Sequence, residues 1–365
     1  MKNKETEEIY KNVKRKISIS NFVEEENVDM VKNKNSIFKS IAIASCMIIS
    51  VTGVVFAKDI GNFISNLFGA NASDGINIAT EQWYIENVNT DYQDYNGIEV
   101  SVNSFLLDDS NFDITFDIKI SDKYNIEEMQ KLDLMDLKVL NEKGKKIFAT
   151  YDIEIEEMQK LYKTEEEARE KYDSYRGAYS GYAEKIGENE LRYYLTATGN
   201  PENFPQAEKL IVTFNRIRIR NNLDSFIISD EDIIYTGEWK YELDVPEEMA
   251  QREGVNYIVK KINDKNIIVD TAILSNTAFK IYLSKANDIE MDHNEYVENS
   301  NGKKFEPSRR SDGDGELSVT SDGKVTYYNT FNLTKFDATD TIKVHLFKTN
   351  GKEVIIELEK EKYFE

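Results

Sequence analysis

The stretch Asn111–Ile120, NFDITFDIKI, decides the fold class of this chain. Its apolar residues occupy every second position, with polar residues between them: Phe112, Ile114, Phe116, Ile118 and Ile120. Because strand side chains point alternately to opposite faces, this period indicates a strand with one buried face. Residues 98–102 alternate in the same way, so the two segments together predict the start of an antiparallel sheet.

The alternation continues through the first half of the chain. Leu137–Phe148 carries the turn residues Asn141–Gly144 between apolar flanks, which predicts a hairpin. Further strands are predicted at Leu191–Thr196, Leu210–Ile219 and Trp239–Val245. We therefore expect residues 76–246 to form an antiparallel β-sandwich of the immunoglobulin-like kind.

One segment, near residues 153–187, interrupts this pattern. It is rich in helix-forming residues, and Thr164 with Glu167 could cap a helix, so we expect a helical insertion there. Its tyrosines could form a surface contact site, for which the candidates are Tyr172, Tyr175, Tyr179 and Tyr182. Their spacing of three and four residues equally fits a helix face that packs on the sandwich.

A second β-sandwich is predicted over residues 254–365, after the polar stretch that follows Pro246. Its expected strands are Val255–Val259, Ile267–Leu274, Ala278–Leu283, Val325–Phe331, Ile342–Phe347 and Val354–Leu358. The acidic turn Asp312–Glu316 lacks the ligand spacing of an EF-hand, so we expect an exposed hairpin turn there.

The one uncharged apolar run, Ile41–Ala57, divides the chain into two unequal parts. Its length is just sufficient for a membrane-spanning helix, which we place at residues 37–58. Lys32, Lys34 and Lys39 precede the run, and no Lys or Arg lies between Lys58 and Lys119. The positive-inside rule therefore predicts a single-pass protein of the cell membrane with a cytoplasmic N-terminus and most of the chain outside.

Two other interpretations of the run remain open. Val55–Ala57 could be a signal-peptidase site, and residues 43–45 before the only cysteine, Cys46, could form a lipidation signal. After the run, residues 59–69 carry apolar side chains at helical spacing and predict a short juxtamembrane helix.

The N-terminal arm, residues 1–36, is expected to contain a short amphipathic helix. Ile9, Val13 and Ile17 fall on one face with Tyr10 beside them, and we take these four as candidate partner-binding residues. The stripe could instead lie on the inner leaflet, or the arm could be a disordered tail that only sets topology.

Charge and composition narrow the possible functions. The net charge is −21, and residues 1–40 hold nine basic and seven acidic side chains, so the remainder carries about −23. Such an outer part would repel nucleic acid. Two separated histidines and the absence of catalytic or phosphate-binding motifs indicate no cofactor, no metal site and no catalytic residue, and hence no enzyme.

Two short motifs carry a family resemblance: FAKDI at residues 56–60, where the span ends, and GEWKYEL at residues 237–243. With the order of arm, span, apolar helix and β domain, they resemble the Gram-positive membrane-anchored proteins that carry domain of unknown function 4179, which are described as anti-sigma factors. The likeness extends from Ser36 onward. The arm departs from better-understood anti-sigma factors because it has no His-x3-Cys-x2-Cys zinc motif.

The resemblance implies a transmembrane regulator whose arm binds an extracytoplasmic-function sigma factor while the outer domains sense or bind at the cell envelope. The alternative that the residues leave open is a surface-anchored binding or adhesion module with an inert arm. The external ligand is not indicated by either interpretation. An extracellular hydrolase would need a converging set of carboxylates, and no such set stands out among the 67 acidic residues.

Overall fold

The computed structural model describes residues 73–82, 84–129, 131–150, 179–198, 204–220, 232–251, 254–284, 289–290, 294–308, 317–319 and 325–361. The chain divides into two compact units at residues 59 and 60, and every described residue belongs to the second unit. The predicted arm, span, juxtamembrane helix and acidic turn lie outside the described residues.

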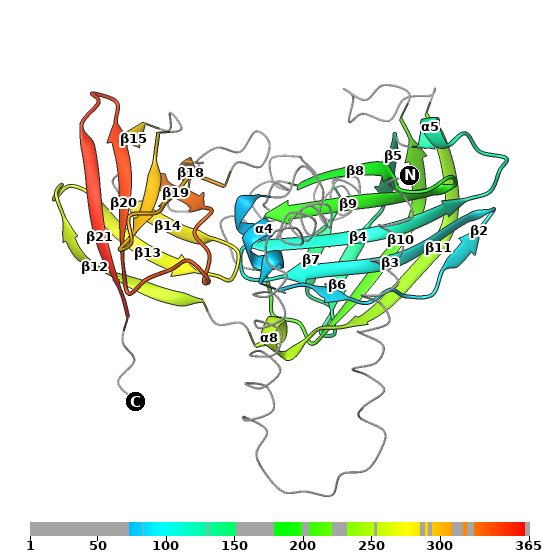
Figure 1. Cartoon of the computed structure of the whole chain (residues 1–365), viewed down its shortest axis with the longest axis horizontal. Helices are drawn as coiled ribbons and strands as arrows, with labels where there is room; N and C mark the ends of the chain where they lie inside the picture. The colour runs from blue at the N-terminus through cyan, green and yellow to red at the C-terminus, as the bar shows by residue number, and fades with distance from the viewer. Residues whose placement is uncertain are drawn as a thin grey trace, which may run out of the picture. The chain divides into compact units, whose positions relative to one another are not determined.

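The first β region, residues 84–245, contains two antiparallel sheets. The first sheet has the order β1-β3-β4-β9-β8, with β2 paired to β3. Its strands run alongside one another in Figure 1 and are β1 (Glu86–Asn87), β2 (Gln93–Tyr95), β3 (Ile98–Leu107), β4 (Asn111–Ile120), β8 (Tyr179–Lys185) and β9 (Glu190–Thr198). The alternating apolar residues of β4 are buried, as the sequence predicts. Asn111, Asp113 and Thr115 between them are buried as well, so the first half of β4 is covered on both faces.

The second sheet of this region has the order β11-β10-β6-β7, with β5 paired to β10. Its strands are β5 (Leu132–Met135), β6 (Lys138–Asn141), β7 (Lys146–Ala149), β10 (Lys209–Ile219) and β11 (Ile233–Asp244). The predicted hairpin is confirmed: Asn141 Oδ1 accepts from the amides of Lys143 and Lys145, and Gly144 has a φ of +74°. Asparagine and glycine are the residues that such a turn favours.

The two sheets of the first region enclose one apolar core around Trp239. The Trp239 ring stacks on Phe214 at 4.9 Å between centroids, and Phe214 in turn meets Phe116 of the other sheet edge-on at 5.8 Å. The indole Nε1 donates to the Gln93 carbonyl at 3.2 Å, so this buried polar atom is satisfied.

Gly237, in the GEWKYEL motif, makes room for this packing. In the β10–β11 pairing, Asn215 alone lies opposite Gly237 and Glu238, which is a β-bulge. A Cβ on Gly237 would lie 2.6 Å from the Trp239 ring and 2.8 Å from the Tyr95 ring. The absence of a side chain therefore allows the two rings to close over the backbone.

The second β region, residues 254–361, forms a ten-stranded antiparallel sheet of order β17-β16-β20-β21-β12-β13-β14-β19-β18, with β15 paired to β20. The strands are β12 (Val255–Ile262), β13 (Ile268–Leu274), β14 (Phe279–Ser284), β15 (Ile289–Glu290), β16 (Tyr296–Asn299), β17 (Lys304–Phe305), β18 (Leu317–Val319), β19 (Val325–Phe331), β20 (Thr341–Lys348) and β21 (Glu353–Lys360). All six strands that the sequence predicts for this half are confirmed.

Strand β12 joins two halves of this sheet. It pairs with β13 only at Val255 and Asn256, and from Tyr257 onward it pairs with β21. Apolar side chains from both halves meet in one core, which includes Phe279, Phe331, Val344 and Ile356. The fold is thus mainly β and antiparallel, as the alternation predicts.

Three short helices complete the described residues: α4 (Asp74–Glu81), α5 (Ile126–Met129) and α8 (Glu247–Ala250). Helix α4, which the sequence analysis does not predict, is capped by Ser73 and buries Ile76 and Ala79 in the first core. Helix α8 occupies the polar stretch expected to separate the domains, and it buries Met249. Within the described residues, no helix is long and apolar enough to cross a membrane.

Candidate functional site: a buried polar junction

The candidate site residues from the sequence fall in different parts of the chain. Ile9, Tyr10, Val13 and Ile17 lie outside the described residues, as do Tyr172 and Tyr175. Tyr179 and Tyr182 are described, and both belong to strand β8. The prediction of a helix is therefore wrong for residues 179–185, because these residues pair with β9 over their whole length.

Packing explains the two described tyrosines better than a shared binding face does. Positions three apart in a strand point to opposite faces, so Tyr179 and Tyr182 do not form one stripe. Tyr179 meets Phe148 edge-on at 5.1 Å, and Tyr182 stacks on Tyr194 at 5.0 Å. Tyr179 nevertheless keeps 37% of its surface exposed.

A cluster of buried polar residues lies elsewhere, where the turn between β3 and β4 meets the turn between β13 and β14. We call it the polar junction: Asp108, Asp109, Ser110, Asn111, Ser275, Thr277 and Lys280. Burying a polar group lowers the stability of the fold unless the group is hydrogen-bonded. Each hydrogen bond in such a cluster therefore contributes to stability.

Asp108 is the centre of the polar junction and is fully buried. Its Oδ1 accepts from the amides of Ser110 and Asn111 at 2.7 and 2.8 Å, which closes the β3–β4 turn. Its Oδ2 accepts from the amide and the hydroxyl of Thr277 at 2.8 and 2.7 Å. One carboxylate therefore shapes its own turn and binds the other β region.

The β13–β14 turn supplies the matching groups. The Thr277 hydroxyl also accepts from Asn111 Nδ2 at 2.5 Å, and Ser275 Oγ donates to Ser110 Oγ at 3.0 Å. Ser275 and Ala278 bond to each other within the turn, which fixes its shape. The contact between the two turns consists of specific hydrogen bonds as well as packing.

Lys280, on β14, brings a charge into the polar junction. Its side chain is 2% exposed, and Nζ donates to the Asp109 carbonyl at 3.3 Å. Burial lowers the pKa of Lys280 to about 8, although the nearby Asp108 and Asp109 carboxylates act in the opposite direction.

Two glycines allow close packing near the polar junction, Gly75 against backbone and Gly254 against a side chain. A Cβ on Gly75, in the first turn of α4, would lie 2.0 Å from the Thr277 carbonyl oxygen, and the Gly75 amide donates to Asn332 Oδ1 at 3.3 Å. A Cβ on Gly254 would lie 2.6 Å from Ile273. Neither position could carry a side chain without moving its neighbour.

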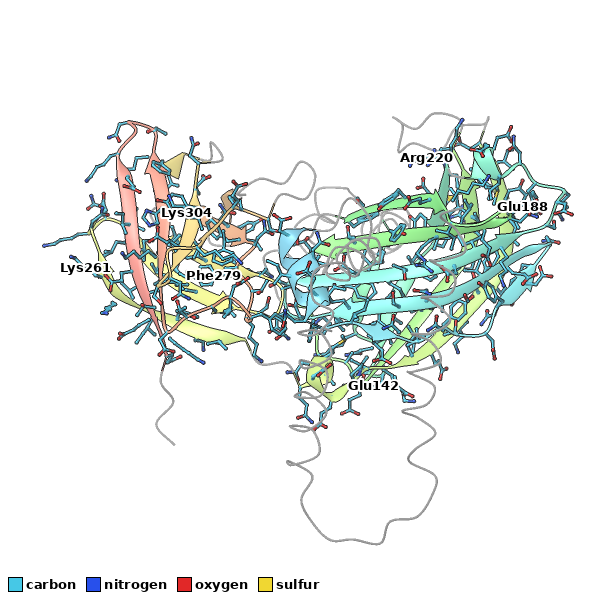
Figure 2. All side chains as sticks on the ribbon, in the orientation of Figure 1. Glu142, Glu188, Arg220, Lys261, Phe279 and Lys304 are labelled. Atoms are coloured by element: carbon cyan, nitrogen blue, oxygen red, sulfur yellow. The ribbon has the colours of Figure 1, made fainter. Side chains whose placement is uncertain are left out.

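Strand β10 carries a second charged feature that sequence reasoning missed. Arg216 and Arg218 of β10, and Arg220 directly after its end, occupy alternate positions. Each pairs with an aspartate: Asp136, Asp232 and Asp133 respectively. The side chains of Arg218 and Asp232 are 5% and 1% exposed. Arg220 is labelled in Figure 2. Burial raises the pKa of Asp133, and Arg220 opposes that rise.

The polar junction and the arginine–aspartate pairs hold their charged side chains in hydrogen bonds and ion pairs. In the described part of the chain, no group of three or more His, Cys, Asp or Glu side chains could hold a metal ion. Charged side chains that extend into solvent, such as Lys261 in Figure 2, belong to the outer surface and not to a converging set.

Comparison with known proteins identifies no family for this chain. No family model matches it, and no curated protein matches it. Among solved structures it is similar to the crystal structure of the conserved domain protein from Bacillus anthracis, at 14% identity and a TM-score of 0.40. That similarity covers 76% of this chain and 90% of the other.

Proposed function

We propose that this protein is a single-pass membrane regulator. In this proposal the arm, residues 1–36, binds an extracytoplasmic-function sigma factor in the cytoplasm. The two β regions sense or bind a ligand at the cell envelope. In this proposal the protein works by binding and not by catalysis.

One observation carries the proposal: the apolar run Ile41–Ala57 separates a small, slightly basic part from a large, strongly acidic one. Three lysines lie just before the run, and Lys58 is the only Lys or Arg between its end and Lys119. This is the charge pattern that sets an inside N-terminus. The resemblance to the anti-sigma family supports sigma-factor binding as the role of the arm.

We further propose that both β regions are immunoglobulin-like sandwiches. Antiparallel sheets that enclose one apolar core in each region support this class. Sandwich domains of this kind bind through surfaces at their strand ends and edges, which fits a role in recognition at the cell surface.

The test is a bacterial two-hybrid assay of the full chain against each extracytoplasmic-function sigma factor of the host cell. We expect one sigma factor to interact, and Ile9→Ser with Val13→Ser to abolish the signal because the apolar stripe is removed. Lys11→Ser with Arg15→Ser is the matched control, since it changes two residues four apart on the opposite face. Absence of any interacting sigma factor, or equal loss in both double variants, would contradict the proposal.

A second candidate function is a surface-anchored adhesion module with an inert arm. The observation that favours it is the position of β8 at the end of the strand order together with the partial exposure of Tyr179, because aromatic side chains at a sheet edge can anchor a partner. In this case deletion of residues 2–30 would leave all function intact, whereas Tyr179→Ala would reduce attachment to the ligand.

A further inference from the structure

The polar junction has a property that simple stabilisation does not explain. The two oxygens of Asp108 already accept four hydrogen bonds from Ser110, Asn111 and Thr277. The hydrogen bonds that join the two turns therefore do not need a cation. A methionine at position 280 would fill the same place without burying a charge. Lysine at this position makes closure of the junction depend on whether the amine carries its proton.

The contact also has the construction of a separable interface. Its hydrogen bonds join residues about 170 positions apart, between two regions that each have their own apolar core. Opening it would break hydrogen bonds between two turns while both cores stay intact. Local opening of this kind requires less free energy than global unfolding.

We propose that the polar junction is a latch between the two β regions, and that the charge on Lys280 controls how tightly it closes. In the closed state the Lys280 amine is buried beside the Asp109 carbonyl. In the open state the amine reaches water. Loss of its proton removes the cost of burial and favours the closed state.

Among the described residues, the charged groups that act on Lys280 lie on the β3–β4 turn. Asp108 and Asp109 face it from the β3–β4 turn. On its own sheet the neighbouring residues are Ile273 on β13 and Thr330 on β19, neither of which is charged. Helix α4, which touches the same turn through Gly75, carries only Asp74 and Glu81 as charged residues.

The burial of the Lys280 amine sets the direction of the pH effect. Burial lowers the pKa of Lys280 from 10.5 to about 8, so between these values the open state holds more protons than the closed state. Closure must therefore strengthen as pH rises through this window. From pH 7 to pH 9 the expected gain in the closed-to-open ratio is about 10-fold.

The test is hydrogen exchange of the Thr277 amide in the full chain, in detergent, at pH 7 and pH 9. The intrinsic exchange rate at each pH is divided by the measured rate, which gives a protection factor. Because this amide donates to Asp108, it exchanges when the latch opens. We expect the wild-type protection factor to rise about 10-fold, and that of Lys280→Met to be high at both pH values.

Two further variants keep the result interpretable. Lys280→Arg keeps its charge at pH 9, so its protection factor should stay low and flat. Lys348→Met removes another buried lysine, which pairs with Asp264 outside the junction, and should show the wild-type rise. Protection of the β10 and β11 amides reports whether each variant folds. An equal change in wild type and Lys280→Met, or no rise in wild type, would overturn the proposal.

Discussion

At the scale of single residues, the GEWKYEL motif has a packing explanation. Replacement Gly237→Ala would place a methyl group within 3 Å of the Trp239 and Tyr95 rings, which are held by stacking and by the Gln93 carbonyl. We expect a loss of about 1 to 3 kcal/mol in the free energy of unfolding, measured by urea denaturation. The neighbouring Glu238→Ala should change it by less than about 0.5 kcal/mol, because the Glu238 side chain is exposed. An equal loss in the free energy of unfolding for Gly237→Ala and Glu238→Ala would show that the Trp239 ring does not exclude a side chain at position 237.

Buried tyrosines predict how stability changes in alkali. Burial raises the pKa of Tyr257 and of Tyr194 to about 12, whereas unfolded tyrosine titrates near 10. Between these values the folded chain holds more protons than the unfolded chain, so the free energy of unfolding falls as pH rises from about 10. Tyr257→Phe should reduce the steepness of that fall in denaturation measured from pH 9 to 11.5. If the slope of the free energy of unfolding against pH is the same in Tyr257→Phe and wild type, Tyr257 ionises in the folded chain as easily as in the unfolded chain.

At the scale of elements, the two turns of the polar junction depend on Asp108. Asp108→Ala leaves the amides of Ser110, Asn111 and Thr277 without their acceptor in a buried place. We expect a loss of about 2 to 5 kcal/mol in the free energy of unfolding. Asp270→Ala, at an exposed aspartate of β13, is the control and should cost less than about 1 kcal/mol. A similar loss in the free energy of unfolding for Asp108→Ala and Asp270→Ala would contradict the claim that Asp108 holds the two turns together.

The same elements separate what the sequence could predict from what it could not. Alternation predicted β3, β4, β10 and the second-region strands because burial of one strand face is a local signal. The predicted helix is wrong at β8 because the residues that precede it in the sequence favour helix. Pairing with β9 determines the conformation of residues 179–185 instead. The polar junction left no signal, since Asp108 and Thr277 are 169 positions apart and both lie in ordinary turn sequences.

At the scale of the whole molecule, the proposed function gives the apolar run and the β regions different tasks. In that proposal the run would set the orientation of the chain in the membrane, and the latch would set whether the second β region acts on the first or moves independently. A regulator needs such a coupled element, because a distant event must bias a two-state contact before it can be transmitted. The acidic surface, about −23 beyond residue 40, favours partners that are neutral or cationic.

The claim that the run separates an inner arm from an outer β region is tested most directly by protease treatment of intact cells. The chain would carry one epitope before Met1 and another after Glu365. We predict that the C-terminal epitope disappears from intact cells, and that the N-terminal epitope stays until the membrane is permeabilised and remains on a membrane-bound fragment. Protection of both epitopes, or loss of both from intact cells, would contradict the account.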